Sequence, residues 1–216
     1  LSHTHTHSLT HSHSLTHSLT HSLTGVCVHR GLTATTPVNG SALMSIGTGS
    51  ACLLSRTAPG APLSWHRMPA PPPGATLAGC GLCSSGALVY LLGAAGAPTG
   101  SPSRLWRLDT ASANQHWEEL APLPGTPRAR AALVCGANNT LHVLGGVLPA
   151  TGGVQQGVVD NWRFAEETWH QQRSAPTKAT LAAPHAPLID ERFVLLLGVG
   201  FQVGAPVVEQ IHGQPR

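Results

Sequence analysis

The sequence predicts an all-β protein built from about three repeats of a four-stranded unit, and the spacing of two residue types carries this prediction. Tryptophans recur every 52 residues, at Trp65, Trp117 and Trp169. Glycines recur at almost the same interval, at Gly93, Gly145 and Gly198. Two residue types that share one period indicate one structural unit repeated along the chain. Such a unit buries its apolar face by stacking on its neighbours.

Each unit is expected to begin with an antiparallel hairpin. Apolar runs at 88–92, 141–144 and 193–197 lead into the three repeated glycines, and short runs of this kind are typical of strands. Turn-forming residues precede each run, and another apolar stretch precedes each turn, at 77–83, 131–137 and 181–189. A strand, a tight turn and a second strand together predict a hairpin.

Two further strands complete the unit in two of the repeats. Trp106 and Trp162 lie in short segments at 105–108 and 161–164, and the marker tryptophans Trp117 and Trp169 follow after a polar turn. Four short strands in such a repeat are typical of a β-propeller blade. We expect the tryptophans to pack one blade on the next, and the glycines to permit close backbone approach near the hub.

The chain divides into three predicted segments. Residues 1–30 form a His/Ser/Thr/Leu low-complexity leader that is expected to be disordered, with loose metal binding by its histidines as the alternative. Residues 31–204 form the propeller segment, with a blade remnant at about 40–69 and repeats at about 70–122, 123–174 and 175–204. Residues 205–216 form an irregular tail. Because closed propellers hold about four to eight blades, either partner copies complete the ring or the sequence is a fragment of a longer chain, and we expect the fragment.

The charge, the apolar runs and the cysteines of the sequence indicate which classes of partner and cofactor to expect. The net charge is +3, and the 12 Lys and Arg residues are scattered, so no nucleic acid partner is expected. The apolar runs are far too short for a membrane span. Five cysteines at irregular spacing do not indicate a disulfide framework, which slightly favours a reducing, cytoplasmic compartment. Cys80 and Cys83 form a single C-x-x-C without a second pair, so we expect no zinc, no other metal site and no cofactor.

The repeat resembles the kelch family of β-propellers. Leu144-Gly145-Gly146 followed by Trp162 and Trp169 matches the kelch pattern of an apolar strand, a double glycine and two spaced aromatics. The copies at Gly93 and Gly198 lack the second glycine. Within the family, 105–109, Trp117 and 124–128 are most similar to the N-acetylneuraminate epimerase group, which are sialic acid mutarotases. The resemblance implies a propeller that binds a protein or a small acidic ligand on one face.

Arg128 and Arg130 are the principal candidates for ligand contact. They follow Pro127 at the start of a unit, and in kelch proteins this strand lines the central channel, where an arginine often meets a ligand. Guanidinium groups bind carboxylates through paired hydrogen bonds. His185 lies in the corresponding strand of the last repeat and is a further candidate. The sequence therefore favours a ligand- or protein-binding module.

The alternative implied by the resemblance is a mutarotase or epimerase acting on an acidic sugar. Such an enzyme needs a general acid and a general base, and the candidates are His142, His185, Glu118 and Asp160. His142 lies within an apolar strand, where a core histidine is expected, and Glu118 is expected to be solvated like Glu119, Glu166 and Glu167. Asn138-Asn139-Thr140 forms a glycosylation motif on a predicted hairpin tip, which matters only in a secreted protein.

Overall fold

The structure is a computed structural model that describes residues 30–56, 58, 60–75, 77–93, 102–148, 157–174, 188–189, 193–196 and 207–210. The predicted disordered leader, except Arg30, lies outside these residues, as do His185 and Gly198. The described chain consists of antiparallel sheets in which strands pair in sequence order, and its one helical element is a 3-10 turn at Ala137–Asn139. The all-β, partial propeller fold class is therefore confirmed.

Three sheets have four strands each, and sequential pairing means that each sheet is one continuous meander. The first contains β1 (Arg30–Val38), β2 (Ala42–Thr48), β3 (Ser50–Ser55) and β4 (Ser64–Met68). The second contains β5 (Gly81–Ser85), β6 (Leu88–Leu92), β7 (Leu105–Asp109) and β8 (Trp117–Leu120). The third contains β9 (Ala132–Cys135), β10 (Leu141–Leu144), β11 (Asn161–Ala165) and β12 (Thr168–Gln172). A fourth sheet has three strands, β13 (Leu188–Ile189), β14 (Phe193–Leu196) and β15 (Val207–Gln210).

The structure differs from the predicted segment boundaries at both ends. The segment expected to be a blade remnant, at about 40–69, supplies three strands of a complete sheet, because Arg30–Val38 pairs with Ala42–Thr48 as its first strand. The expected irregular tail contributes β15, which pairs with β14. Neither strand ends in the repeated glycine, so the glycine period gave no sign of them.

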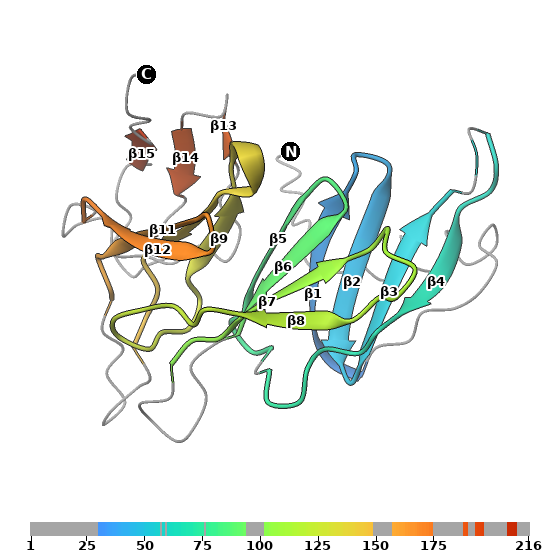
Figure 1. Cartoon of the computed structure of the whole chain (residues 1–216), viewed down its shortest axis with the longest axis horizontal. Helices are drawn as coiled ribbons and strands as arrows, with labels where there is room; N and C mark the ends of the chain where they lie inside the picture. The colour runs from blue at the N-terminus through green and yellow to red at the C-terminus, as the bar shows by residue number, and fades with distance from the viewer. Residues whose placement is uncertain are drawn as a thin grey trace, which may run out of the picture.

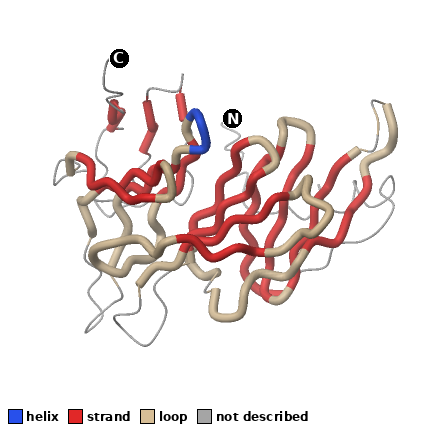
Figure 2. The backbone as a smooth tube through the Cα atoms, in the orientation of Figure 1, coloured by secondary structure: helices blue, strands red, loops and turns tan. Residues whose placement is uncertain are grey.

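The sheets follow one another along the molecule, with β1–β4 at one end and β9–β12 toward the other (Figure 1). The first strands of successive sheets lie side by side, since β1 contacts β5 and β5 contacts β9. The tube in Figure 2 shows the same succession of strands joined by loops and turns. Stacking through first strands is how propeller blades surround an axis.

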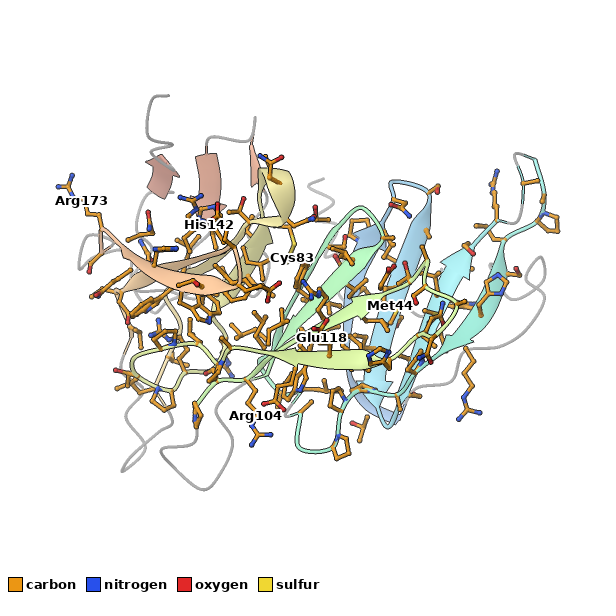
Figure 3. The ribbon with its side chains drawn as sticks, in the orientation of Figure 1. Met44, Cys83, Arg104, Glu118, His142 and Arg173 are labelled. Atoms are coloured by element: carbon orange, nitrogen blue, oxygen red, sulfur yellow. A yellow bond between two sulfur atoms is a disulfide. The ribbon has the colours of Figure 1, made fainter. Side chains whose placement is uncertain are left out.

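Two apolar clusters lie between successive sheets, one on each face of β5–β8. Side chains alternate along a strand, so Val89 and Leu91 face the first sheet while Tyr90 and Leu92 face the third. Met44 belongs to the first cluster and Cys83 to the second (Figure 3). Apolar burial on both faces explains why the middle blade has the most continuous apolar strands.

The marker tryptophans make a hydrogen bond that is repeated from blade to blade. The indole Nε1 of Trp117 donates to the carbonyl of Pro69 at 3.1 Å, and that of Trp169 donates to the carbonyl of Ala121 at 2.9 Å. Each acceptor lies just after the fourth strand of the preceding blade. The 52-residue period therefore reflects an indole that packs on the preceding blade and also bonds to its backbone.

Gly93 and Gly146 lie where a side chain would collide, and Gly145 has a backbone conformation that a side chain would strain. A Cβ on Gly93 would come within 2.8 Å of the Trp106 ring. Gly145 and Gly146 have φ values of 59° and 111°, and a Cβ on Gly146 would meet the backbone of Ala129 and the side chain of Arg128. The double glycine thus lets the chain turn closely around Arg128.

A disulfide joins Cys83 of β5 to Cys135 of β9, with 6.0 Å between their Cα atoms, and Cys52 is disulfide-bonded as well. The interpretation that the cysteine spacing indicates no disulfide framework was therefore wrong, and the cysteine argument for a reducing compartment falls with it. Cys83 and Cys135 are themselves 52 residues apart, so the bond joins equivalent positions of neighbouring blades. Cys80 is a buried free thiol, and burial raises its pKa to about 11.

Candidate functional site

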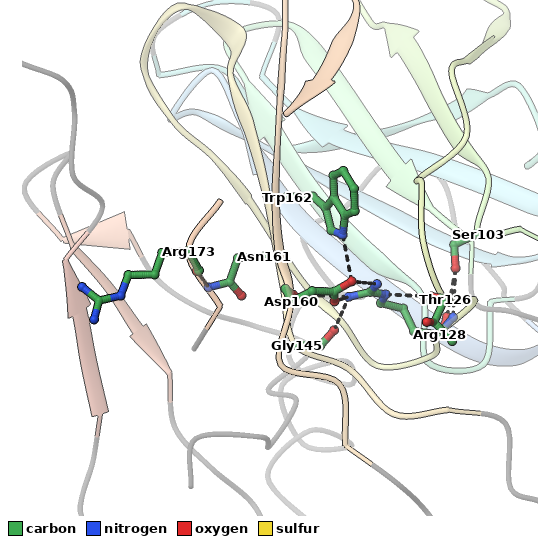
Figure 4. A network of polar contacts seen from close by, with 8 residues as sticks. All are labelled: Ser103, Thr126, Arg128, Gly145, Asp160, Asn161, Trp162 and Arg173. Carbon is green, nitrogen blue, oxygen red and sulfur yellow. Dashed lines mark hydrogen bonds and ion pairs between the residues drawn. The ribbon is translucent and has the colours of Figure 1, made fainter. Parts of the chain in front are cut away.

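Arg128 lies just before β9 and is one of the most deeply buried side chains, with no exposed side-chain surface. Its Nη2 donates to Asp160 Oδ2 at 2.8 Å, and its Nη1 pairs with Asp160 Oδ1 (Figure 4). It also donates to the carbonyls of Gly145 at 3.2 Å and Thr126 at 3.1 Å. These partners all belong to the chain itself. The predicted ligand-contact role of Arg128 does not agree with this burial, and the guanidinium instead holds the double-glycine turn to the chain before β11.

The carboxylate of Asp160 compensates the buried positive charge of Arg128. Its Oδ2 accepts a further hydrogen bond from Trp162 Nε1 at 3.0 Å. Burial by itself would raise the pKa of Asp160, but the hydrogen bonds from Arg128 and Trp162 outweigh burial and hold the pKa below its ordinary value. An ionised carboxylate engaged in this way is a weak proton acceptor. Asp160, a candidate base in the sequence analysis, is therefore a structural anion in this site.

Ser103 fixes the backbone of Arg128 from the side of the preceding blade. The Ser103 hydroxyl, which is buried, donates to the Arg128 carbonyl at 3.1 Å, and the Arg128 N–H donates back to the Ser103 oxygen at 3.2 Å. The N–H of Leu123 also donates to the carbonyl of Ser103 at 2.9 Å. Figure 4 shows this contact beside the guanidinium network. The segment that leads into β9 is thereby fixed on both sides.

Arg130 is placed differently from Arg128, although only one residue separates them. It is exposed, and its backbone has a φ of 55°, a conformation that is uncommon for a non-glycine residue. Its N–H donates to the Gly79 carbonyl at 2.7 Å, and its aliphatic stem lies over Gly79. Within the described part of the chain, the Arg130 guanidinium makes no hydrogen bond or ion pair. Its charge is available to a ligand at the junction of two blades.

His142 lies within β10 and is buried, opposite Arg163 of β11. Burial, and to a smaller extent the charge of Arg163, lowers the pKa of His142 to about 4. The imidazole is therefore neutral near pH 7 and poorly suited to act as a general acid there. This agrees with the expectation of a core histidine.

Glu118 lies on the outer strand β8 and binds Arg107, which was not anticipated. Arg107 donates to Glu118 through Nε at 3.1 Å and Nη2 at 2.8 Å, and through Nη1 to Glu167 of the next blade at 2.9 Å. Both carboxylates remain about half exposed. Glu118 and Glu167 are thus solvated as expected, but both also pair with Arg107, and the Arg107–Glu167 pair joins two neighbouring blades at their outer edge.

A small depression lies beside these ion pairs. It has a volume of about 70 Å³, room for a few water molecules. It is lined by Arg107, Asp109, Ser112, Asn114, His116 and Glu118. In the described parts of the chain, no group of three or more His, Cys, Asp or Glu side chains is placed to hold a metal ion, and no helix is long and apolar enough to span a bilayer.

Of the predicted site residues, the structure leaves Arg130 free to meet a ligand and places Arg128 in the interior. His185 lies outside the described residues. The one sequence signal for the Arg128–Asp160 pair is the segment Asp160-Asn161-Trp162. It follows the double glycine and places an acidic residue at the start of the third strand of the blade. The disulfide had a clearer signal, since Cys83 and Cys135 keep the same interval as the tryptophans.

No protein-family model and no curated protein matches the chain. Among solved structures, the chain is similar to one described as the structure of YjhT, with 21% identity and a TM-score of 0.45. The match covers 58% of this chain and 35% of that chain, so this chain spans about a third of the length of its structural neighbour.

Proposed function

We propose that this propeller segment is a ligand- or protein-binding module of the kelch type, in which Arg130 recognises an acidic group. The observation that carries the proposal is the exposed guanidinium of Arg130, which has no hydrogen-bond or ion-pair partner among the described residues and lies at the junction of the first strands of two blades. A carboxylate is the group that a guanidinium binds through two parallel hydrogen bonds. The ligand class is therefore a carboxylate, carried by an acidic sugar or by an acidic peptide.

The rigidity of the surroundings supports this proposal. Arg130 follows a segment that is fixed by Ser103, by the Arg128–Asp160 pair and by the hydrogen bond to Gly79. A binding group held on a rigid frame loses less conformational freedom when its ligand arrives. The neighbouring disulfide between β5 and β9 holds together the two strands at this junction.

Binding is favoured over catalysis because the described acid–base candidates have other roles. His142 is buried and neutral near pH 7, Asp160 is paired with Arg128, and Glu118 is paired with Arg107. A mutarotase of the N-acetylneuraminate epimerase type remains the alternative, and it rests on the sequence resemblance. That enzyme would need an acid and a base beside one sugar ring.

The test uses the full chain and two probes, N-acetylneuraminate and a hexaglutamate peptide, titrated by calorimetry or by NMR. Arg130→Ala should weaken binding of the preferred probe about tenfold or more, since a charge-assisted pair contributes about 1.5–3 kcal/mol. Arg67→Ala, which removes an exposed arginine from the outer strand β4, should leave the affinity unchanged. Equal affinities for the Arg130→Ala variant and the parent chain contradict the proposal.

The same samples separate binding from catalysis. Mutarotation of an N-acetylneuraminate anomer, followed by NMR with and without the protein, should proceed at the rate found in buffer alone. A faster rate that survives in the Arg130→Ala variant would favour the mutarotase, with its acid and base outside the residues considered above.

A further inference from the structure

The turns that join the first two strands of two blades carry the same short motif. The β1–β2 turn contains Asn39-Gly40-Ser41, and the β9–β10 turn contains Asn138-Asn139-Thr140. Asparagine followed two residues later by serine or threonine, with no proline between them, is the acceptor motif for N-linked glycans. The two motifs therefore occupy equivalent places in two blades of the propeller.

Turn geometry explains the asparagines but not the complete motif. Asn39 and Asn138 have φ values of 49° and 55°, a region that asparagine tolerates well and that hairpin turns require. Such a turn sets no requirement for a hydroxyl two residues after the asparagine. Thr140 also donates a hydrogen bond to the carbonyl of Ala137, whereas the Ser41 hydroxyl makes no hydrogen bond within the described residues. The Thr140 hydroxyl thus has a structural role in its own turn, whereas the hydroxyl of Ser41 calls for a second explanation.

Both asparagines are accessible. Asn39 and Asn138 are exposed at the tips of their hairpins, and in the described part of the chain neither side-chain amide is held in a hydrogen bond. The apolar clusters lie between the sheets, away from these tips. A sugar attached to either amide nitrogen would project into solvent without displacing a core side chain.

The disulfide supplies an independent observation about the compartment. The Cys83–Cys135 bond joins the strands β5 and β9, and disulfides persist in the secretory pathway and outside the cell while they are rare in the cytosol. N-linked glycosylation takes place in the same oxidising compartments. We propose that this chain folds in the oxidising lumen of the secretory pathway and carries N-linked glycans on Asn39 and Asn138.

Two covalent steps follow from the proposal. In the first, the side-chain nitrogen of each asparagine attacks C1 of an oligosaccharide linked to a lipid pyrophosphate. The C1–oxygen bond breaks, the lipid pyrophosphate leaves and the amide nitrogen loses one proton. In the second, the thiols of Cys83 and Cys135 lose two protons and two electrons to the disulfide of an oxidoreductase, which becomes a dithiol.

The decisive experiment uses the natural chain, isolated from its source cells. Free thiols are blocked by alkylation before denaturation, and the peptides are mapped by mass spectrometry before and after removal of N-linked glycans. We expect the peptides of Cys83 and Cys135 to be joined, and glycans to be released from Asn39 and Asn138. Alkylated thiols at Cys83 and Cys135, or two unmodified asparagines, would overturn the proposal.

A matched set of variants tests the assignment to Asn138. The full chain is directed into the endoplasmic reticulum of a eukaryotic host, and gel mobility is compared with and without glycan removal. Each occupied site should add one step to the mobility shift seen on glycan removal. Asn138→Gln and Thr140→Ala should each remove one such step, while Thr140→Ser should keep it. Asn139→Gln is the control, because it leaves Asn138 and Thr140 in place, and loss of the step in that variant contradicts the assignment.

The corresponding set for the first hairpin is Asn39→Gln and Ser41→Ala, which should each remove the other step, and Ser41→Thr, which should keep it. A parent chain that shows no step at all after delivery to that compartment contradicts the proposal at both positions.

Discussion

At the scale of single residues, Arg128 and Asp160 form a pair whose two members depend on each other. The arginine side chain is fully buried and the carboxylate is 20% exposed. Removing one partner of such a pair leaves a charge that neither water nor protein fully compensates. Both residues are thus better understood as structural than as catalytic groups.

Arg128→Leu should therefore lower the free energy of unfolding by about 3 kcal/mol or more, measured by urea denaturation. Arg104→Leu is the control, since Arg104 is exposed and lies 3.6 Å from Glu119. Its removal should cost about 0.5 kcal/mol. Equal losses in the two variants would show that the buried network does not stabilise the fold.

His142 gives a prediction about pH. Burial and the charge of Arg163 lower its pKa from 6.5 to about 4. The unfolded chain therefore binds more protons between these values, and stability should fall as the pH drops from about 6.5 toward 4. His142→Gln should flatten this part of the stability profile. A decline in stability of the same slope in the variant would contradict the prediction.

At the scale of strands and blades, the close approach of β5 to β9 determines which residues fit. A Cβ on Gly81 of β5 would come within 2.7 Å of the Cβ of Leu133 on β9. Indole hydrogen bonds at the fourth strands secure the outer part of the same stack. Neighbouring blades are thus matched both at their first and at their last strands.

Gly81→Ala should destabilise the chain by about 1–3 kcal/mol, because the added methyl group overpacks this contact. In a Leu133→Gly background, which lacks the Cβ that the new methyl group meets, Gly81→Ala should cost less than in the parent chain, so the double variant should be more stable than the sum of the single changes predicts. Calorimetric or urea unfolding of all four proteins measures this coupling, and strict additivity would show that the two positions do not touch.

Trp117→Phe tests the indole contact itself. The variant keeps an aromatic ring but loses the donor to the Pro69 carbonyl, so it should cost about 1 kcal/mol or more in unfolding free energy. His116→Ala, at the neighbouring exposed position, should change stability much less. Comparable losses in the two variants would argue against the indole hydrogen bond.

At the scale of the whole molecule, the disulfide closes a loop of one full repeat. Cys83→Ala and Cys135→Ala should each lower the free energy of unfolding by about 2–4 kcal/mol under oxidising conditions. The double variant should lose little more than either single variant, because one change already removes the bond. Additive losses in the double variant would mean that the cysteines stabilise the fold separately, without a shared bond.

The sequence alone determined the all-β class, the repeat and the positions of most strands in the described blades. These features depend on local alternation and on a regular interval between large and small residues, so a linear pattern can carry them. The interval between Cys83 and Cys135 was also visible in the sequence, but interval by itself does not bring two thiols together. The missed first strand, Arg30–Val38, has no repeated glycine or tryptophan to mark it.

Only the tertiary structure decided which polar side chains meet. Arg128 and Asp160 are 32 residues apart, and Arg107 and Glu167 are 60 apart. Whether such groups face each other depends on how one sheet is rotated and stacked against the next. That stacking buried Arg128 while leaving Arg130 exposed, although a two-residue spacing in a regular strand would have placed both on one face. The positive φ of Arg130 breaks the alternation there and so separates a structural arginine from a candidate ligand-binding one.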